Sequence, residues 1–460
     1  GATWRNGSGP GQGLQPTAIG TGNATSIDFV DIIWPDGVFQ SELAVPIGGP
    51  TLLAETQRQI SSCPLVFVRG DEGAPFEFIT DVLGVGGMGY LVEPGVAAPP
   101  RPVESLLLPG RPVEIRLAEP MEEACYLDAV RLVAVDLPEG EEIVLDERLG
   151  IEGAPPTSEV IPITGVLQPV KALNDRGEDV LEAVLEHDLR AADPGEVDPR
   201  FIGLLRQEHV LELEFAESIE DRDLLLAEGW VEYPYSQTNF AAWQSGTTYD
   251  PPTLEARTSE GDWVVIAERF GYPAGMPRAM CLPIDSLPEG CTALRLRSNQ
   301  EIYWDRIRLA RRSGVRFQAH SSDPISAELV RCGFPRRTTG DQRQPHYDYQ
   351  DRAPMGDVRH QAGFYTGFGP CLPLVKQVDD ACAIIGPGEE IRLRFGDPIA
   401  PEPGMKRHWV LELNGWCKDM DLFTVEGERL EPLPARATDG PGPEARGLMK
   451  RFNVRFASGQ

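Results

Sequence analysis

Apolar and β-branched residues recur along the chain in short runs that are separated by turn-forming residues. The first such segment consists of an apolar run at residues 27–34, the turn residues Pro35-Asp36-Gly37 and a return run at residues 38–43. Proline fixes φ at the entry to a turn, and aspartate and glycine suit its later positions. The segment therefore predicts a β-hairpin.

Similar runs predict strands along the rest of the chain, because their alternation or β-branched content outweighs a helical period. One helix is predicted at residues 178–189, where apolar residues fall on one side and Asp193-Pro194-Gly195 follows. We expect a mainly β fold of several β-sandwich-like domains joined by Gly/Pro-rich turns, with few short helices. The expected strands are residues 51–56, 65–69, 76–83, 113–117, 126–135, 208–215, 302–309, 390–395 and 409–413.

The chain has 460 residues, which is more than one hydrophobic core usually organises, so we expect several domains. Charged connectors and changes in composition suggest where they divide. The expected domains are residues 1–62, a short β segment; 63–217, a β domain; 218–312, an aromatic-rich β-sandwich-like domain; and 313–460, a carboxy-terminal β domain.

The charge of the chain narrows the range of partners. Lys and Arg number 42 against 71 Asp and Glu, which gives a formal net charge of −29. Such a surface repels phosphate backbones and anionic lipids, so we expect neither nucleic-acid nor peripheral membrane binding. No stretch approaches the roughly 18 apolar residues that a membrane helix needs, so no transmembrane segment is expected. The opening Gly1-Ala2-Thr3-Trp4 would suit a mature or clipped product whose export signal lies upstream.

The eight cysteines are widely spaced, with no two within three residues of each other. The absence of CxxC excludes zinc ribbons, thioredoxin chemistry and c-type haem attachment. An even number at wide spacing is compatible with disulfides in an oxidising compartment and equally with buried reduced thiols. The best disulfide candidates are Cys281 with Cys291 and Cys371 with Cys382, because each pair encloses a short segment that a hairpin could close.

Three short motifs resemble functional sites, but their sequence context argues against each. Residues 84–89 match GxGxxG, yet the prolines between residues 94 and 102 cannot continue the helix that a dinucleotide site needs. Arg69-Gly70-Asp71 is the tripeptide that integrin ligands display, and ordinary turn chemistry explains it equally well. His320-Ser321-Ser322-Asp323 groups catalytic residue types in sequence, whereas the members of a triad meet in space. We therefore assign no catalytic residue and no nucleotide-binding residue.

Two groups of side chains are candidate binding sites. Acidic residues could coordinate calcium, the one cofactor considered, although an acidic composition also produces such clusters. Aromatic rings in the stretch 230–249 could stack on sugars, although core packing uses the same rings. The candidate calcium ligands are Asp348, Asp351, Asp357, Asp419 and Asp421, and the candidate carbohydrate-binding residues are Trp230, Tyr233, Tyr235, Trp243 and Tyr249.

Residues 32–40, Ile-Ile-Trp-Pro-Asp-Gly-Val-Phe-Gln, resemble the end of the ASPIC/UnbV domain, whose hallmark is an apolar strand, Trp-Pro-Ser/Asp-Gly and a short return strand. Residues 63–67, 76–84, 126–132 and 415–421 are similar to segments of large FG-GAP repeat proteins that carry this domain and are related to cartilage acidic protein. The resemblance implies an exported protein that acts in binding, adhesion or assembly, and it makes residues 1–62 a partial ASPIC/UnbV-like segment.

Members of that family place a calcium-binding β-propeller of FG-GAP repeats before this region. This chain begins inside the ASPIC/UnbV-like segment and contains no propeller, so the calcium loops of the propeller are carried over to none of its residues. We expect it to be either a fragment or a relative that has lost the propeller and kept the carboxy-terminal β-domains as an independent subunit.

Together these observations predict a non-catalytic binding or scaffold protein, located in the periplasm, outside the cell or at its surface. It would be a structural or accessory subunit of a larger protein assembly, with other proteins as its partners. One alternative is a carbohydrate-binding β-sandwich module with a glycan ligand. Another is a cryptic hydrolase that uses the acids between Asp348 and Asp357.

Overall fold

The computed structural model describes residues 18–27, 29–33, 39–43, 45–53, 64–93, 95–150, 155–232, 234–354, 358–421, 423–437 and 440–459. The chain forms two compact units, Gly1–Gln59 and Ile60–Gln460. Strands dominate the described residues, which contain two α-helices, α1 (Ser236–Gln244) and α2 (Pro443–Phe452). The expected mainly β fold with few short helices is therefore confirmed. Neither of these helices has the length and apolar character needed to span a bilayer.

The first unit contains the hairpin expected from its sequence. Strands β1 (Phe29–Ile33) and β2 (Phe39–Leu43) are antiparallel, with Ile33 opposite Phe39. The turn at residues 34–38 lies outside the described residues. Of the strand expected at residues 51–56, the described part, residues 51–53, has no regular secondary structure.

The second unit begins with a β-sandwich of two antiparallel sheets. One sheet has the order β27-β23-β29-β8-β3-β4, and the other has the order β22-β9-β30-β7 with β28 also paired to β9. Strand alternation sends Ile115, Leu117 and Leu393 of the first sheet inward against Leu132 and Leu411 of the second. The strands are β3 (Leu65–Arg69), β4 (Glu77–Asp81), β7 (Val103–Leu108), β8 (Glu114–Glu119), β9 (Glu123–Pro138), β22 (Gln318–Ser322), β23 (Pro324–Arg331), β27 (Gly369–Pro370), β28 (Ala383–Ile385), β29 (Glu389–Phe395) and β30 (Met405–Asp419).

A second β-sandwich lies beside the first in the same unit. Its sheets have the orders β10-β12-β21-β15-β19 and β13-β14-β20-β16-β17. Leu211 and Leu294 of one sheet pack against Leu225 and Ile307 of the other. The strands are β10 (Glu142–Leu145), β12 (Val160–Leu167), β13 (Lys171–Leu173), β14 (Leu204–Glu214), β15 (Leu224–Val231), β16 (Thr253–Arg257), β17 (Trp263–Ala267), β19 (Arg278–Pro283), β20 (Ala293–Gln300) and β21 (Ile302–Arg312).

Short strand pairs complete this unit. The β24–β25 hairpin lies against the outer face of the first sandwich, where Tyr347 packs with Phe67 and Phe78. The pairs are β5 (Leu91–Glu93) with β6 (Val96–Ala97), β11 (Arg148–Leu149) with β18 (Tyr272–Pro273), β24 (Phe334–Thr339) with β25 (Pro345–Ala353), and β26 (Gly363–Tyr365) with β31 (Arg455–Ala457).

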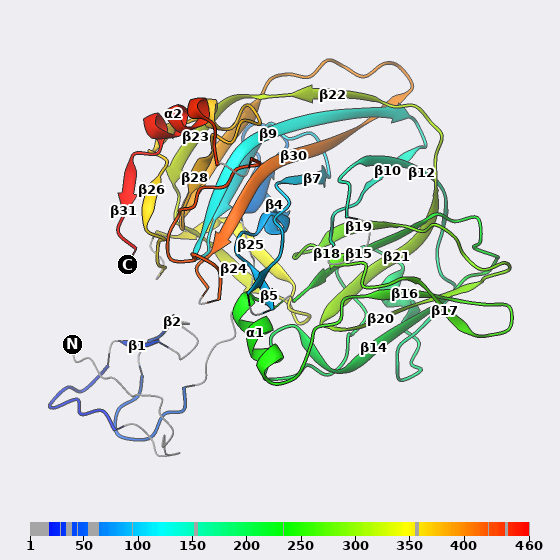
Figure 1. The fold of residues 1–460 in the computed structure, drawn as a ribbon, viewed down its shortest axis with the longest axis horizontal. Coiled ribbons are helices and arrows are strands. Elements are labelled where there is room, and N and C mark those ends of the chain that lie inside the picture. Colours follow the sequence, from blue (N-terminus) through cyan, green and yellow to red (C-terminus); the bar gives the residue numbers. More distant parts are fainter. Residues whose placement is uncertain are drawn as a thin grey trace. The chain divides into compact units, whose positions relative to one another are not determined.

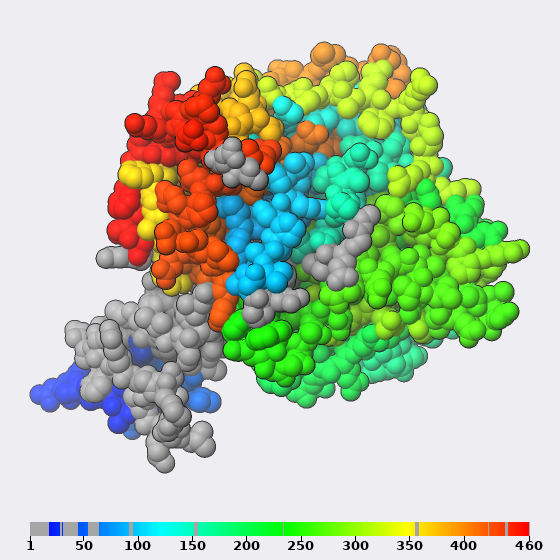
Figure 2. Space-filling view, in the orientation of Figure 1, coloured from blue at the N-terminus to red at the C-terminus, as the bar shows by residue number. Residues whose placement is uncertain are grey.

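The second sandwich is an insertion within the first (Figure 1). Residues 139–317 separate β9 from β22, yet these two strands are hydrogen-bonded neighbours, with Ala134 opposite His320. In Figure 2 the blue to cyan and the orange to red segments, which build the first sandwich from distant parts of the chain, lie next to one another. An apolar cluster that includes Val135, Leu145 and Val410 joins the two sandwiches.

The strand pairing differs from the expected division at residues 217 and 312. Strand β14, on one side of the first boundary, pairs with β20 on the other side, with Leu211 opposite Leu296. Strand β9 pairs with β30, which the second boundary separates from it. The division after Gln59 lies close to the expected boundary after residue 62.

The predicted helix at residues 178–189 is wrong. Only a 3₁₀ turn forms there, at Leu181–Val184, and Leu189 has a φ of 65°, which an α-helix does not allow. The apolar residues that suggested a helix pack as an irregular segment, with Val184 buried in the core of the second sandwich. Helices α1 and α2 were not predicted, because α1 is short and α2 begins at Pro443 in a stretch rich in Gly and Pro.

Candidate functional site

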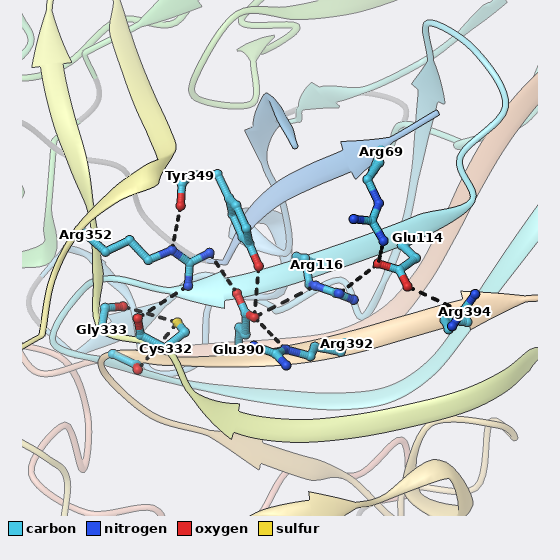
Figure 3. A network of polar contacts seen from close by, with 11 residues as sticks. Arg69, Glu114, Arg116, Cys332, Gly333, Tyr349, Arg352, Glu390, Arg392 and Arg394 are labelled. Atoms are coloured by element: carbon cyan, nitrogen blue, oxygen red, sulfur yellow. Dashed lines mark hydrogen bonds and ion pairs between the residues drawn. The ribbon is translucent and has the colours of Figure 1, made fainter. Parts of the chain in front are cut away.

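A network of arginines and glutamates covers the outer face of the six-stranded sheet (Figure 3). Glu390 on β29 is fully buried, and its carboxylate accepts hydrogen bonds from Tyr349 Oη at 3.1 Å and Arg352 Nη2 at 3.2 Å. Arg392 Nε donates a third bond at 2.9 Å. Tyr349 and Arg352 belong to β25, so Glu390 fixes the β24–β25 hairpin to the sheet.

A second carboxylate, that of Glu114 on β8, continues the network. Arg69 and Arg116 donate to it at 2.5 and 2.8 Å, and Arg394 lies 3.4 Å away. Arg116 lies between the two carboxylates, since its Nε is also 3.9 Å from Glu390. Alternation explains the arrangement: in β8 and β29 the residues between these charged positions face the core. Charge-assisted hydrogen bonds of this kind are strong, so these carboxylates anchor the surrounding arginines.

Aromatic rings support these arginines and decide how Arg69-Gly70-Asp71 is presented. The guanidinium groups of Arg69 and Arg116 lie 4.8 and 4.7 Å from the ring centroid of Phe76. Arg69 is thus held by a carboxylate and a ring instead of extending into solvent. The structure favours the explanation of this tripeptide as a structural turn.

A second polar cluster lies where the two sandwiches meet. Arg278 on β19 is only 1% exposed; it donates to Glu104 on β7 and lies 3.5 Å from Glu147. Its Nη1 also donates to the backbone oxygen of Asp81 at 3.3 Å. Burial, opposed by Arg278, raises the pKa of the Asp81 carboxyl to about 7 and the pKa of Glu147 to about 7. All four side chains are enclosed, so the cluster joins the sandwiches and has no open surface for a substrate.

The described candidates among the calcium ligands are Asp348, Asp351, Asp419 and Asp421, and Asp348 and Asp351 have structural roles. Asp348 accepts backbone N–H bonds from Gln350 and Asp351 at 2.8 and 3.3 Å, which makes it a turn cap. Asp351 forms an exposed ion pair with Arg336 at 3.0 Å. Asp357 lies outside the described residues.

The carboxylate of Asp421, in the second pair of acidic candidates, also has structural partners. Asp421 accepts backbone N–H bonds from Phe423 at 2.7 Å and from Gln237, in the first turn of α1, at 3.2 Å. The backbone oxygen of Asp419 lies 3.5 Å from Gln361 Nε2. Across the part of the chain that the structure describes, no three His, Cys, Asp or Glu residues gather in a way that could hold a metal ion.

The four candidate carbohydrate-binding rings that are described do not form a common platform. Trp230 and Tyr235 are buried, and Trp230 stacks on Tyr303 at 5.4 Å and donates to the oxygen of residue 342 at 2.8 Å. Tyr249 donates from its hydroxyl to the backbone of residue 202. Only Trp243, on α1, is well exposed among the four rings that are described, at 51%. Tyr233 lies outside the described residues.

The expected disulfides are not formed. Cys281 packs on the outer face of one sheet of the second sandwich, whereas Cys291 lies in the core between the two sheets. Cys371 belongs to the core of the first sandwich, and Cys382 to a separate cluster around Tyr126. Each expected pair thus places its thiols in different packing layers. Short separation in sequence did not bring them together.

The glycine-rich and histidine-containing motifs take structural roles. Gly84–Gly86 form a single 3₁₀ turn, and Gly86 packs so closely that an added Cβ would lie 2.7 Å from the oxygen of Gly415. No helix follows that could bind a pyrophosphate among described residues 87–102. His320 is an exposed residue of β22, where it pairs with β9.

One exposed surface was not anticipated from the sequence. Phe364 on β26 and Phe456 on β31 lie opposite each other, with ring centroids 5.2 Å apart. We call Phe364 and Phe456 the phenylalanine surface; each is at least half exposed, and Phe456 reaches 63%. Phe368, which is also exposed, lies against the guanidinium of Arg455 at 4.3 Å. The only sequence signal was the phenylalanine content of two short segments, which also suits a core.

Comparison of the sequence with models of known protein families and with curated proteins found no match.

Proposed function

We propose that the protein is a non-catalytic binding protein, a structural or accessory subunit of a larger extracytoplasmic assembly. The observation that carries the proposal is the phenylalanine surface. Aromatic residues are enriched in protein interfaces, and here two exposed phenylalanines lie in contact with each other.

The scaffold behind this surface suits a binding role. Tyr365, next to Phe364, is fully buried and donates to the backbone of Gln361 at 3.2 Å. Arg455, next to Phe456, pairs with the buried carboxylate of Glu389 at 2.6 Å. The exposed rings therefore project from fixed backbone, which lowers the entropy lost when a partner binds. The proposed extracytoplasmic location rests on the resemblance of residues 32–40 to the ASPIC/UnbV domain, because proteins that carry this domain are exported.

The test is affinity capture from native membranes and surrounding medium with mass spectrometry. Immobilised wild-type protein is compared with the double variant Phe364→Ser/Phe456→Ser and with Phe317→Ser, a control that removes an exposed phenylalanine on another segment. Because surface substitutions change stability by only about 0.5 kcal/mol, all three should unfold at similar temperatures. We expect partners that the wild type and the control retain and that the double variant loses.

The same protein samples distinguish the alternatives. Glycan binding that Trp243→Ala abolishes would replace the proposal with carbohydrate recognition. Turnover of an ester, glycoside or phosphoester would replace it with hydrolysis. Identical capture by the double variant and the wild type would show that the phenylalanine surface is not the binding site.

A further inference from the structure

Strand β17 lies at the end of its sheet. Among the described residues it pairs with β16 alone, with Trp263 opposite Arg257 and Val264 opposite Ala256, and it is the last strand in the order β13-β14-β20-β16-β17. Figure 1 shows it at the rim of the second sandwich. On such a strand alternate N–H and C=O groups point away from the sheet, where another strand can pair with them.

The sequence of β17 lacks the features that usually protect an edge. It reads Trp-Val-Val-Ile-Ala, with no proline, glycine or charge, and Val265 is 54% exposed. Three other terminal strands of the two sandwiches have features that protect an edge. Strand β27 has two residues and ends in Pro370, β22 is polar, and on β7 the N–H of Leu107 donates to Glu147 at 3.0 Å.

Both faces of β17 are apolar where a further strand would lie. Trp263 stays outside the core, against the guanidinium of Arg295 at 4.5 Å. Ile266 packs at the margin of the core on the other face. The five residues span roughly 17 Å, so the edge accommodates an extended segment of about five residues with apolar side chains on both faces.

The charges around β17 select the kind of partner. Glu260, Asp262 and Glu268 flank the strand, are exposed, and form no ion pair within the described ranges. Antiparallel pairing of two copies centred on Val265 would place Asp262 of each copy beside Glu268 of the other. Each copy also has a formal net charge of −29. Like charges in this position oppose self-pairing, whereas Lys or Arg flanking the incoming strand would be attracted.

We propose that β17 binds, by strand addition, an extended apolar segment of a partner protein that is flanked by lysine or arginine. This goes beyond the proposed function, because the strand lies in the second sandwich and the phenylalanine surface on the separate β26–β31 pair. Two such surfaces would let one subunit hold two partners. The proposal for β17 and the proposal for the phenylalanine surface are tested separately, so either can be refuted while the other stands.

The test uses a fluorescent peptide with five alternating valines and isoleucines between lysine pairs. Its controls are the same peptide with glutamate flanks and the same peptide N-methylated at alternate residues, which removes strand pairing. Binding by fluorescence anisotropy should be about tenfold tighter for the lysine peptide than for the glutamate peptide, and this ratio should fall at about 0.5 M salt. The N-methylated peptide should not bind.

Protein variants locate the binding site. Val265→Lys should weaken binding about tenfold or more, while Val170→Lys, at a similarly exposed valine elsewhere, should leave it unchanged. Hydrogen exchange of residues 263–267 should slow when the peptide is bound. Equal binding of all three peptides, or wild-type binding by Val265→Lys, would overturn the proposal. A wild-type dimer that Val265→Lys dissociates would make a second copy the occupant and would overturn it as well.

Discussion

Substitution of Arg278 with methionine should destabilise the protein in a pH-dependent manner. Methionine fills a similar volume but removes the only cation that we find paired with the buried carboxylates of Glu104 and Glu147 in the described part of the chain. The backbone of Asp81 loses a donor at the same time. Removing one partner of a buried ion pair costs about 3–5 kcal/mol, which is a large share of the stability of a typical protein.

The dependence on pH follows from the two raised carboxyl groups. The pKa values of Asp81 and Glu147 are about 7 in the folded protein, against usual values of 3.8 and 4.5. Between about pH 4 and 7 the folded protein therefore binds more protons than the unfolded chain, and its stability falls as pH rises through this window. Without Arg278 both pKa values should rise further. The variant should therefore gain more stability than the wild type as the pH falls from about 8 to about 5.5, by roughly 1 kcal/mol for each unit by which a carboxyl pKa rises further.

Urea unfolding followed by tryptophan fluorescence at about pH 8 and about pH 5.5 measures both effects. Arg336→Met is the matched control, because its ion pair with Asp351 is exposed and should contribute at most about 1 kcal/mol at either pH. Arg278→Lys keeps the charge, so its stability should lie between those of the wild type and the methionine variant. It replaces the methionine variant in the measurement if that variant fails to fold. A loss below about 1 kcal/mol at pH 8, or an equal loss at both pH values, would refute the reasoning.

Two further predictions concern buried backbone and a buried amine. Gly229→Ala should destabilise by about 2 kcal/mol or more in thermal unfolding, since the added Cβ would lie 2.2 Å from the oxygen of Tyr303, whereas Gly447→Ala, with open space on α2, should stabilise by up to about 1 kcal/mol. Equal shifts of both variants would contradict this contrast. Lys418→Met should cost about 3 kcal/mol in urea titration, because the buried ammonium donates to three backbone carbonyls at 3.0–3.1 Å that would lose their donor. If Lys418→Met lost no more than about 0.5 kcal/mol of stability, water would be replacing the amine as the hydrogen-bond donor to these carbonyls.

Local structure was largely determined by the sequence. The expected strand at residues 65–69 coincides with β3, and those at 302–309 and 390–395 lie within β21 and β29. The hairpin around residues 34–38 also formed. These predictions hold because alternation along a strand is set by neighbouring residues, one face of which must be buried. The proline-rich stretch after Gly89 likewise excluded a dinucleotide-binding helix.

The candidate sites could not be predicted in the same way. Trp230 and Trp243 belong to the same aromatic-rich stretch, yet one is buried and the other exposed. Arg278 and Glu104 are 174 residues apart and meet only because two sandwiches pack together. Likewise, nothing in a strand's own pattern states that β17 would be left at the end of its sheet.

The sequence by itself thus predicted the mainly β fold and several of its strands. The tertiary structure decided which strands pair, that residues 139–317 form a sandwich inserted between β9 and β22, and which apolar side chains remain exposed. The physical reason is that a strand's hydrogen-bonding groups are the same whatever its sequence. Its neighbour is therefore chosen by packing of the whole unit, over separations that no local pattern records.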